Sequence, residues 1–577
     1  MRANLDAFGI ANQRFRSINW NAEATTLQTA VVCIIAALLS CCFTGFVFGV
    51  SNNQFHLPIM ERLYDEPQFA NDAFVQSLKY FSSGVWLALA AVPKFSDGGY
   101  GIFLLLFYAS RLLSLVGFMC CASLLGINSL RERLIFAAII CFTVLLDGNS
   151  FAGHGGLFLV FFSHSEIANG TILLAIFFAA RGRFTAALLC AGATFLINAF
   201  MGVWVLAPLA FIALASLRAG KVDLRSLFLQ AVPGAIGFAV LASPVLYNAL
   251  SNPELRAPIT FDYGAFLREW YGSHYLIDAN SPLDIFMLLS VIGLGWLSFK
   301  ALENPASALT AAFLGILAVY VIGVLVSLVT SHPAIMKLHL LRSSAVIQLL
   351  AALGAGALST RWLCSPERTQ STLYGPVLLL CLCVSKSLIP VGAVVVALAA
   401  HWQPQRLPGA LRPAILTGLL LIVLPWQIWQ RGSLNQQLTA AVKDWQTVGV
   451  WARSTTPPDS NFLILTASAD SLARMPAVDV QRTLLLSASA AAFQAAAHRR
   501  IWVDFYNGGM VVFQPSYYDE WHSRASAVLA LRTISEKLRY AHDNGVAYVI
   551  DDCTLYEAEN IQPAFRSGQL CAAAAKS

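Results

Sequence analysis

The feature that most constrains this chain is a series of apolar runs separated by short connections. The first run, Leu27–Val50, has the length of a membrane-spanning helix. Hydrophobic residues make up 57% of the chain and charged residues only 12%, which is about half the charged share of a soluble domain. So little charge cannot coat a soluble body of 577 residues, and we expect lipid to surround most of the chain.

About twelve further apolar runs follow the first, and together they predict an α-helical polytopic membrane protein with about thirteen spans. Several runs are shorter than the ~20 residues of a lone span, which is typical of helices packed inside a bundle. The later runs lie near residues 101–125, 134–146, 167–180, 184–200, 202–217, 227–247, 285–299, 309–329, 340–358, 373–384, 388–400 and 414–429.

Basic residues fall in alternate connections, so they predict which connections share a side of the membrane. The cytoplasmic side, with the N-terminus, is assigned from Arg2, Arg14, Arg16, Arg131, Arg133, Arg181, Arg183, Arg218, Lys221, Arg225, Lys300, Arg361, Arg368, Arg406 and Arg412. The other side then carries residues 51–100, 148–165, 248–284, 331–339 and everything after 431. Because the basic residues are dispersed and form no stripe, nucleic acid is excluded as a partner.

The last stretch, residues 431–577, predicts a small outer α/β domain attached to a bundle of residues 1–430. Strand patterns alternate with helical ones, which favours a parallel or mixed sheet; the strands are expected at Asn461–Thr466, Arg500–Phe505 and Val546–Ile550, and the helices at Ala440–Arg453 and Tyr517–His542. Cys553 and Cys571 share this domain. They pair if the domain faces an oxidising compartment and are otherwise free thiols.

The first outer connection, residues 51–100, concentrates carboxylates. Glu61, Asp65, Glu66 and Asp72 lie within twelve residues, and Asp72 precedes an amphipathic stretch, Ala73–Val92, expected at the membrane interface. A carboxylate there can take a proton from an acceptor hydroxyl or hold a divalent metal. The alternative is that Asp72 caps the following helix and the other carboxylates are solvated.

Cationic residues gather at a second outer junction. His332, Lys337, His339 and Arg342 lie within eleven residues, and Arg256 and Arg268 occupy the preceding outer connection. Such a cluster at the lipid boundary suits a phosphate or pyrophosphate head group, or it contacts lipid head groups by snorkelling. The loop from Gly148 to Gly156, with His154, either lines the entrance of a site or needs glycine for its backbone.

The layout resembles the GT-C superfamily of membrane glycosyltransferases, in particular a bacterial group of unassigned substrate. The resemblance rests on the acidic first outer loop and on the tail sequences Trp451-Ala-Arg453-Ser-Thr-Thr-Pro457-Pro458-Asp459-Ser-Asn-Phe462, Arg500-Ile-Trp-Val-Asp504-Phe and Glu520-Trp521. It implies a polyprenyl-phosphate-linked sugar donor, a glycan, lipid or protein acceptor on the outer face, and a bacterial inner-membrane location with a periplasmic C-terminal domain.

By that resemblance Asp72 is the general base or orients the acceptor, and Asp65 and Glu66 support it or bind a metal; no other cofactor is implied. Arg256, Arg268, Lys337 and Arg342 hold the donor phosphate, with His332 and His339 in the same pocket. Three alternatives stay open: a transporter or flippase using Arg111, Asp147 and Glu166, a lipid-linked O-antigen polymerase or ligase relying on outer Arg and His, and a non-catalytic membrane scaffold.

Overall fold

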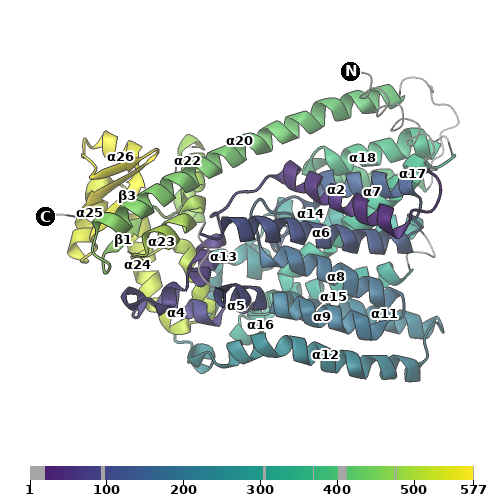
Figure 1. Ribbon diagram of the computed structural model, residues 1–577, viewed down its shortest axis with the longest axis horizontal. Coiled ribbons are helices and arrows are strands. Elements are labelled where there is room, and N and C mark those ends of the chain that lie inside the picture. Colours follow the sequence, from purple (N-terminus) through teal and green to yellow (C-terminus); the bar gives the residue numbers. More distant parts are fainter. Residues whose placement is uncertain are drawn as a thin grey trace, which may run out of the picture.

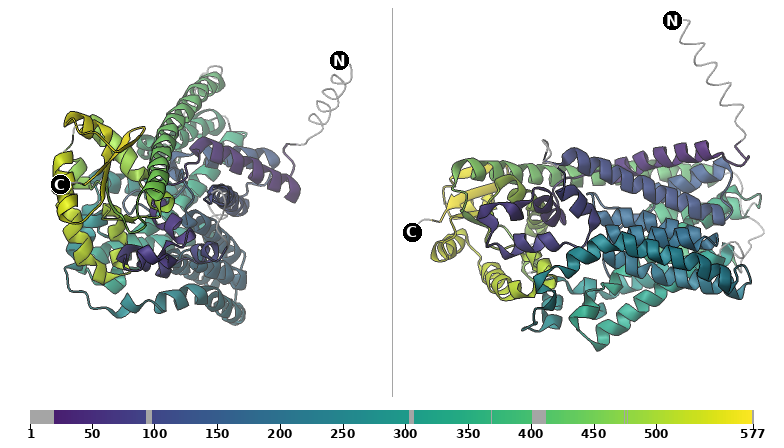
Figure 2. Two further views of the ribbon diagram at one scale, coloured as in Figure 1. Left: turned by 60° about the vertical axis from the view of Figure 1, so that its left-hand side comes forward. Right: turned by 60° about the horizontal axis from the view of Figure 1, so that its bottom comes forward.

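The computed structural model describes residues 20–92, 98–302, 307–367, 369–400, 412–473, 475 and 477–575. Long helices run side by side in a bundle, and a small α/β unit lies at one end of it (Figure 1). The two further views show the same arrangement (Figure 2). Arg2, Arg14, Arg16, Arg368 and Arg406, which the orientation prediction used, lie outside the described residues.

Each predicted apolar run falls on helix. The bundle contains α2 (Thr26–Thr44), α6 (Tyr100–Leu124), α7 (Leu130–Phe142), α8 (His164–Ala180), α9 (Phe184–Ile197), α10 (Ala199–Trp204), α11 (Leu206–Arg218), α12 (Leu224–Leu250), α14 (Pro282–Leu302), α15 (Ser307–Val329), α17 (Ser344–Cys364), α18 (Gly375–Cys383) and α19 (Ile389–Ala399). Within the described ranges, seven helices are long and apolar enough to cross a membrane. The chain is therefore a helical, multi-pass membrane protein, while the count of about thirteen spans stays a prediction.

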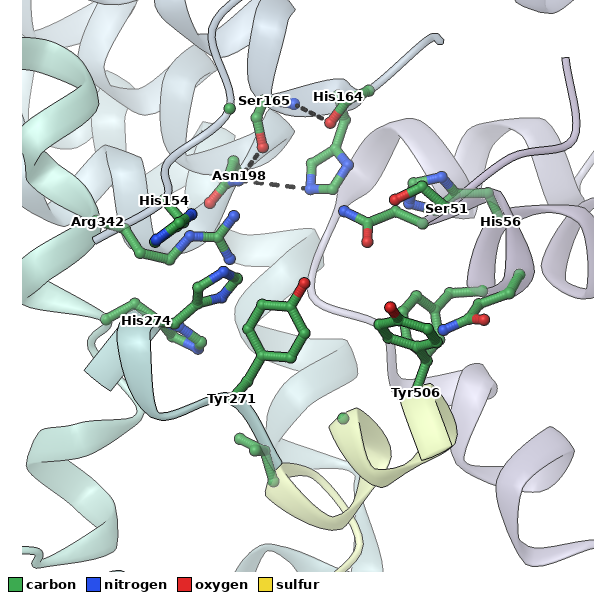
Figure 3. Close-up of a pocket in the computed structure, with 18 of the residues that line it drawn as sticks. Ser51, His56, His154, His164, Ser165, Asn198, Tyr271, His274, Arg342 and Tyr506 are labelled. Carbon is green, nitrogen blue, oxygen red and sulfur yellow. Dashed lines mark hydrogen bonds between the residues drawn. The ribbon is translucent and has the colours of Figure 1, made fainter. Parts of the chain in front are cut away.

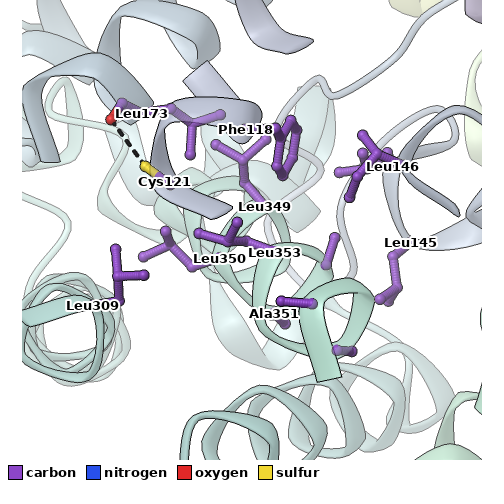
Figure 4. Packing of buried hydrophobic residues seen from close by; sticks show 14 of the residues in the cluster. Phe118, Cys121, Leu145, Leu146, Leu173, Leu309, Leu349, Leu350, Ala351 and Leu353 are labelled. Atoms are coloured by element: carbon purple, nitrogen blue, oxygen red, sulfur yellow. Dashed lines mark hydrogen bonds between the residues drawn. The ribbon is translucent and has the colours of Figure 1, made fainter. Parts of the chain in front are cut away.

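The outer helices expose large apolar side chains, as lipid contact requires. On α12, Phe228 and Val240 are each about two-thirds exposed. The centre of the bundle is α17, on which nearly every side chain is buried. A helix that is apolar all round belongs inside: Figure 4 shows Leu349, Leu350 and Leu353 of α17 among side chains from several neighbouring helices.

Short elements join the long helices. They are α3 (Asn53–Met60), η1 (Leu63–Asp65), η2 (Pro67–Phe69), α4 (Ala73–Ser77), η3 (Leu78–Tyr80), α5 (Gly84–Ala90), η4 (Val144–Leu146), η5 (Pro253–Arg256), α13 (Tyr263–Tyr275), η6 (Ile277–Ala279), α16 (Pro333–Met336), η8 (Leu340–Ser343) and η10 (Lys386–Leu388); the π-helical η9 (Gln370–Tyr374) precedes α18. Among them α4, α5, α13 and α16 lie at the end of the bundle that meets the α/β unit (Figure 1).

The predicted amphipathic stretch Ala73–Val92 is not one helix. It divides into α4, η3 and α5 because Ser83 takes an extended conformation, with φ −151° and ψ 123°. The Ser83 hydroxyl donates to the carbonyl of Ile197, 2.6 Å away. The stretch is therefore broken where it docks on the end of α9, which periodicity alone does not reveal.

The helix α20 (Arg412–Thr455) links the bundle to the C-terminal unit without a break. Residue 431, the predicted domain boundary, lies inside it, and Arg431 forms two 2.9 Å contacts with the carboxylate of Asp147 in the bundle. The apolar run and the first helix of the domain are thus one element; the division at 430/431 stays a prediction.

The sheet is mixed, which is one of the two arrangements that the alternating pattern left open. Its order is β2-β1-β3-β5-β4, with β1 parallel to β2 and β3, and β5 antiparallel to β3 and β4. The strands are β1 (Asn461–Ile464), β2 (Arg500–Ile501), β3 (Tyr548–Asp552), β4 (Phe565–Ser567) and β5 (Leu570–Ala574).

Helices cover this sheet, and a disulfide joins one of these helices to a strand. The elements are α21 (Ala469–Leu472), α22 (Ala477–Ser489), α23 (Ala491–Ala497), η11 (Phe505–Val512), η12 (Pro515–Tyr517), α24 (Tyr518–Ala530), α25 (Ile534–Asp543) and α26 (Cys553–Ala558). The single helix predicted for Tyr517–His542 is instead α24 and α25, because Thr533 and Glu536 form a capping box that starts α25. Cys553 and Cys571 form a disulfide.

Candidate functional site

A cavity of about 260 Å³ lies where the bundle meets the C-terminal unit. All four connections assigned by sequence to one side of the membrane contribute to its wall, and so does η11 of the C-terminal unit (Figure 3). Its polar lining includes Ser51, His56, Asn149, His154, His164, Ser165, Asn198, Tyr271, His274, His339, Arg342 and Tyr506. We call it the histidine cavity.

The charge of the histidine cavity is one-sided. Five of the ten histidines in the chain line it, together with one arginine. No aspartate, glutamate or lysine is among the described residues that line it. Such a cavity is suited to an anion, because its charged group is a cation, its histidines offer N–H donors and no carboxylate repels a negative charge.

Arg342 supplies the positive charge. It lies in η8, directly before the central helix α17, and its guanidinium points toward His154, His274 and Tyr271 (Figure 3). Within the described residues no carboxylate forms an ion pair with it. Holding a half-buried cation without a counter-charge is costly. An anionic ligand at this position would supply the missing counter-charge and gain an ion pair with Arg342.

The glycine-rich loop positions Arg342 through its backbone. A Cβ atom on Gly155 would lie 2.6 Å from the carbonyl oxygen of Arg342 and 2.7 Å from the Cβ of Ala345. The Ser150 hydroxyl lies 2.8 Å from that of Ser344. Both sequence interpretations of this loop therefore apply: His154 lines the cavity, and glycine is required where the loop meets η8 and α17.

His154 and His274 flank Arg342 and hold neutral rings. Burial, reinforced by Arg342, holds the pKa of His274 well below its usual range, and burial also lowers the pKa of His154. The two rings lie 5.7 Å apart, nearly parallel. A neutral imidazole can accept a proton from a hydroxyl or donate an N–H to a phosphate oxygen.

The backbone around the cavity is unusual. Ser51, His154 and His339 have left-handed φ values of 53°, 51° and 51°, and Tyr271 leaves the helical conformation inside α13. Conformations that non-glycine residues rarely adopt concentrate where function constrains a side chain. All four of these residues line the histidine cavity.

On the opposite wall His164 is held by an indole. The Trp86 Nε1 group donates to His164 Nδ1 over 3.0 Å, and the ring of His56 stacks on Trp86 at 3.9 Å. Because the indole only donates, Nδ1 of His164 is the acceptor and a neutral ring carries its proton on Nε2. That nitrogen lies beside Asn198 at the cavity (Figure 3).

The six predicted phosphate-binding residues do not converge. His339 and Arg342 line the histidine cavity. Arg256 and His332 are exposed outside it, and Arg268 is exposed and paired with Asp278 at 2.9 Å. Lys337 is half-buried and not part of the lining. His339 approaches the Tyr275 hydroxyl at 3.3 Å through Nε2, and its buried Nδ1 has no partner within the described residues.

The three predicted carboxylates have separate surroundings. Asp65 is exposed and pairs with Arg62 at 2.6 Å, and Glu66 contacts His498 of the C-terminal unit at 2.8 Å. Asp72 caps α4 by accepting from Val75 N over 2.9 Å. It lines a different cavity, of about 480 Å³, which we call the Asp72 cavity. Burial raises the pKa of Asp72 to about 6.

Nothing in the described ranges assembles three or more histidine, cysteine, aspartate or glutamate residues in a geometry that can hold a metal ion. Asp65 and Glu66 point to different partners, Arg62 and His498. The structure therefore gives no cluster to which the divalent metal considered for the acidic loop can be assigned.

The charges considered for a transport path are paired within the protein. Arg111 and Glu166, both buried, lie 3.2 Å apart and join α6 to α8. Glu166 also accepts from Ser110 and from the backbone of Leu159. Asp147 pairs with Arg431, as described above. These contacts give all three residues a role in holding helices together.

Sequence reasoning did not single out His56, Asn198, Tyr271, His274 or Tyr506. The signal that was available is the side assignment: all five cavity histidines lie in connections predicted to share one side, or at their ends. Grouping histidines by predicted side, rather than by spacing along the chain, would have gathered them.

No family model and no curated protein matches the sequence. Among solved structures, the arabinofuranosyltransferase AftD from Mycobacteria is similar with a TM-score of 0.40 and 13% sequence identity. The match covers 93% of this chain and 36% of that one, so the chain spans about a third of the length of the protein it matches.

Proposed function

We propose that this chain transfers a sugar from a polyprenyl-phosphate-linked donor to an acceptor on the outer face of the membrane, as the GT-C resemblance implies. The observation that carries the proposal is Arg342: a cation with no carboxylate partner within the described residues, in a cavity lined by five histidines at the end of a membrane bundle. A lipid-linked sugar phosphate is an anion that belongs at that boundary.

The lining suits the rest of such a donor. Beside the polar groups, aromatic side chains face the cavity, including Phe55, Phe81, Phe200 and Trp270. Binding sites for small molecules combine a largely apolar wall with a few polar groups that fix orientation. In this arrangement Arg342 holds the phosphate, and the polyprenyl chain lies among apolar helix surfaces.

The reaction then follows from the groups at hand. An acceptor hydroxyl attacks the anomeric carbon of the donor, the bond from that carbon to the phosphate oxygen breaks, and the lipid phosphate leaves. Arg342 stabilises the negative charge that builds on the leaving phosphate. His274 or His154, neutral and adjacent, takes the proton that the acceptor hydroxyl loses.

The location is proposed to be a bacterial inner membrane with the C-terminal unit in the periplasm. The disulfide Cys553–Cys571 supports an oxidising environment for that unit. The acceptor is a glycan, a lipid or a protein, and donor chemistry alone does not distinguish these.

A second candidate is a lipid-linked O-antigen polymerase or ligase. It is favoured by one specific observation: the described lining of the histidine cavity offers Arg and His and no carboxylate. Both functions use a lipid-phosphate-linked sugar and assign the same role to Arg342. They differ in the acceptor, so product analysis separates them.

The first test is lipid-phosphate binding by the purified full chain in nanodiscs, with undecaprenyl phosphate as probe and native mass spectrometry as readout. Arg342→Gln removes the charge and leaves no carboxylate unpaired, so we expect normal folding and binding weakened about tenfold or more, since hydrogen bonds to charged groups are the strong ones. The matched comparison is Arg268→Gln, exposed and outside the cavity, with binding unchanged.

Equal binding by wild type and Arg342→Gln would contradict the assignment of the phosphate site. Loss of binding in Arg268→Gln, with Arg342→Gln unaffected, would move the site to the outer surface predicted from sequence. Complementation of a knockout strain, with surface glycans profiled, then tests transfer: Arg342→Gln and His274→Gln should fail to restore the glycans that Arg268→Gln restores.

A further inference from the structure

The Asp72 cavity lies between the first outer segment and the C-terminal unit. Its wall comes from α4, the start of β1, strand β2, η11, η12, α24 and the connection between α25 and β3. At about 480 Å³ it has a volume within the range of small-molecule sites, which is about 300–1,000 Å³. The proposed donor site does not use it.

Two buried polar side chains face this cavity without partners. Asn507 is 4% exposed and Tyr517 5% exposed, both line the cavity, and neither the Asn507 amide nor the Tyr517 hydroxyl has a hydrogen-bond partner within the described residues. Their polar atoms open onto the cavity, where a ligand can form hydrogen bonds with them in place of water. Groups of this kind at a cavity wall fit a ligand that satisfies them.

Asp72 adds a carboxylate with spare capacity. One oxygen, Oδ1, accepts from Val75 N at 2.9 Å, and Oδ2 has no donor within the described part of the chain. Arg500 donates through Nη2 to the Asp459 carbonyl at 3.1 Å, while its buried Nε is unpartnered. The cavity thus offers both acceptors and donors at fixed positions.

The charges of the wall are nearly balanced, in contrast to the histidine cavity. Asp72, Asp459 and Glu520 face Arg500 and Arg524. Glu520 and Arg524 pair with each other, and the Arg524 guanidinium lies 3.7 Å from the centre of the Trp502 ring. A balanced, hydrogen-bonding wall favours an uncharged ligand rich in hydroxyl groups over a phosphate.

The two cavities share walls. The consecutive residues Tyr506 and Asn507 of η11 line the histidine cavity and the Asp72 cavity respectively. On the other side, Phe55 lines the histidine cavity and Phe74 lines the Asp72 cavity, and the centres of their rings lie 6.0 Å apart. A ligand in the Asp72 cavity is therefore held one short helix away from the proposed donor site.

We propose that the Asp72 cavity is a saccharide-binding site that holds the acceptor glycan, with Asp72, Asn507 and Tyr517 as its hydrogen-bonding residues. The saccharide assignment rests on this cavity alone; the acceptor role rests on the proposed function. Sugar hydroxyls donate to Asp72 and exchange hydrogen bonds with the Asn507 amide and the Tyr517 hydroxyl.

The test uses the purified full chain in detergent and a glycan array of neutral hexose, pentose and N-acetylhexosamine oligosaccharides. The affinity for the best array ligand is then measured for variants. Tyr517→Phe removes one hydroxyl, and Asp72→Asn removes the charge while keeping a residue that caps α4. We expect each to weaken binding about tenfold. Asp519→Asn, an exposed carboxylate on α24 outside the cavity wall, should leave the affinity unchanged.

Arg342→Gln separates this proposal from the proposed function. It removes the donor phosphate contact but leaves the Asp72 cavity intact, so saccharide binding should persist. If no glycan binds the wild-type chain, or if Tyr517→Phe and Asp72→Asn bind as well as wild type, the saccharide site is overturned. If saccharide binding depends on these residues but undecaprenyl phosphate does not bind, the saccharide site stands and the donor assignment fails.

Discussion

At the scale of single residues, Arg342 and Asp72 illustrate how tertiary surroundings decide a role. Both come from polar clusters in outer connections, and sequence reasoning placed them in one site. In the structure Arg342 faces five histidines, whereas Asp72 caps α4 and lines another cavity. The helix-cap alternative for Asp72 is therefore real, and capping leaves its second oxygen available to a ligand.

The raised pKa of Asp72 predicts a pH-dependent stability. Burial raises this pKa to about 6, so the folded chain holds the proton more tightly than the unfolded chain. Protonated Asp72 therefore favours the folded chain. This stabilisation is fully present below about pH 4 and is lost as the pH rises through about 6. Relative to wild type, Asp72→Asn should therefore gain melting temperature as the pH rises from about 4 to about 7. A difference that does not change with pH would contradict this.

The buried pair Arg111–Glu166 predicts a strongly non-additive mutant cycle. Arg111→Leu leaves the Glu166 carboxylate buried without its partner, and we expect a loss of about 3–5 kcal/mol in unfolding free energy. Replacing both residues by leucine removes the uncompensated charge and should cost less than the single change. Unfolding by denaturant in detergent gives these values. A double variant less stable than Arg111→Leu would exclude this account of the pair.

At the scale of elements, local sequence signals explain where helices begin and end better than which helices meet. The capping box of Thr533 and Glu536 starts α25, and the apolar pattern of α17 predicts a buried helix. The Gly148–Gly156 loop is different, because Gly153 and Gly155 are required where the loop packs on η8 and α17, elements nearly two hundred residues later.

Two glycines of that loop give a matched prediction. In Gly155→Ala the new Cβ would lie 2.6 Å from the Arg342 carbonyl oxygen, so the loop or Arg342 must move, and binding of undecaprenyl phosphate should weaken several-fold. In Gly148→Ala the new Cβ meets nothing within 4 Å, but its φ of +72° costs about 1–2 kcal/mol. That variant should lose stability and keep its affinity for the lipid phosphate.

If both variants lose affinity equally, the loop acts through general destabilisation and not through the position of Arg342. Melting temperatures measured on the same preparations supply the control. Restoring affinity in Gly155→Ala by Ala345→Gly would show that crowding against Ala345 Cβ, 2.7 Å from the new Cβ, contributes to the loss beside the Arg342 contact.

At the scale of the whole molecule, the site is built where two parts meet. The bundle supplies Arg342 and the five histidines, and the C-terminal unit supplies Tyr506. Glu66 and His498 hold the same parts together at 2.8 Å, and α20 runs continuously from one to the other. The C-terminal unit thus forms part of the cavity wall, and we expect its folding to affect binding of the lipid phosphate.

The disulfide therefore predicts an effect on the site as well as on stability. Cys553 and Cys571 are separated by 18 residues, and the chain-entropy account gives about 3 kcal/mol for a loop of that size. The double variant Cys553→Ser/Cys571→Ser should have a lower melting temperature than the wild type. Melting temperature and binding of undecaprenyl phosphate, measured on both chains, check this. A double variant that melts with the wild type would contradict it.

Hydropathy and periodicity are local properties of the chain, and they predicted the lipid surroundings, the helices of the bundle and three of the five strands. They did not predict β4 and β5. Basic residues in alternate loops predicted which connections share a side, and four of those connections contribute to the histidine cavity. Of the residues predicted for the phosphate pocket, Arg342 and His339 both line the histidine cavity.

Only the tertiary structure decided the rest. Contacts between distant segments decided the break at Ser83, the break before α25 and the pairing of Arg111 with Glu166. Such contacts also decided that Asp72 and Arg342 line different cavities. Spacing along the chain does not encode which way a side chain points after seven or more helices have packed, because packing fixes each rotation from partners elsewhere in the sequence. The residue type gives the sign of each charge. The tertiary structure decides which cavity that charge lines.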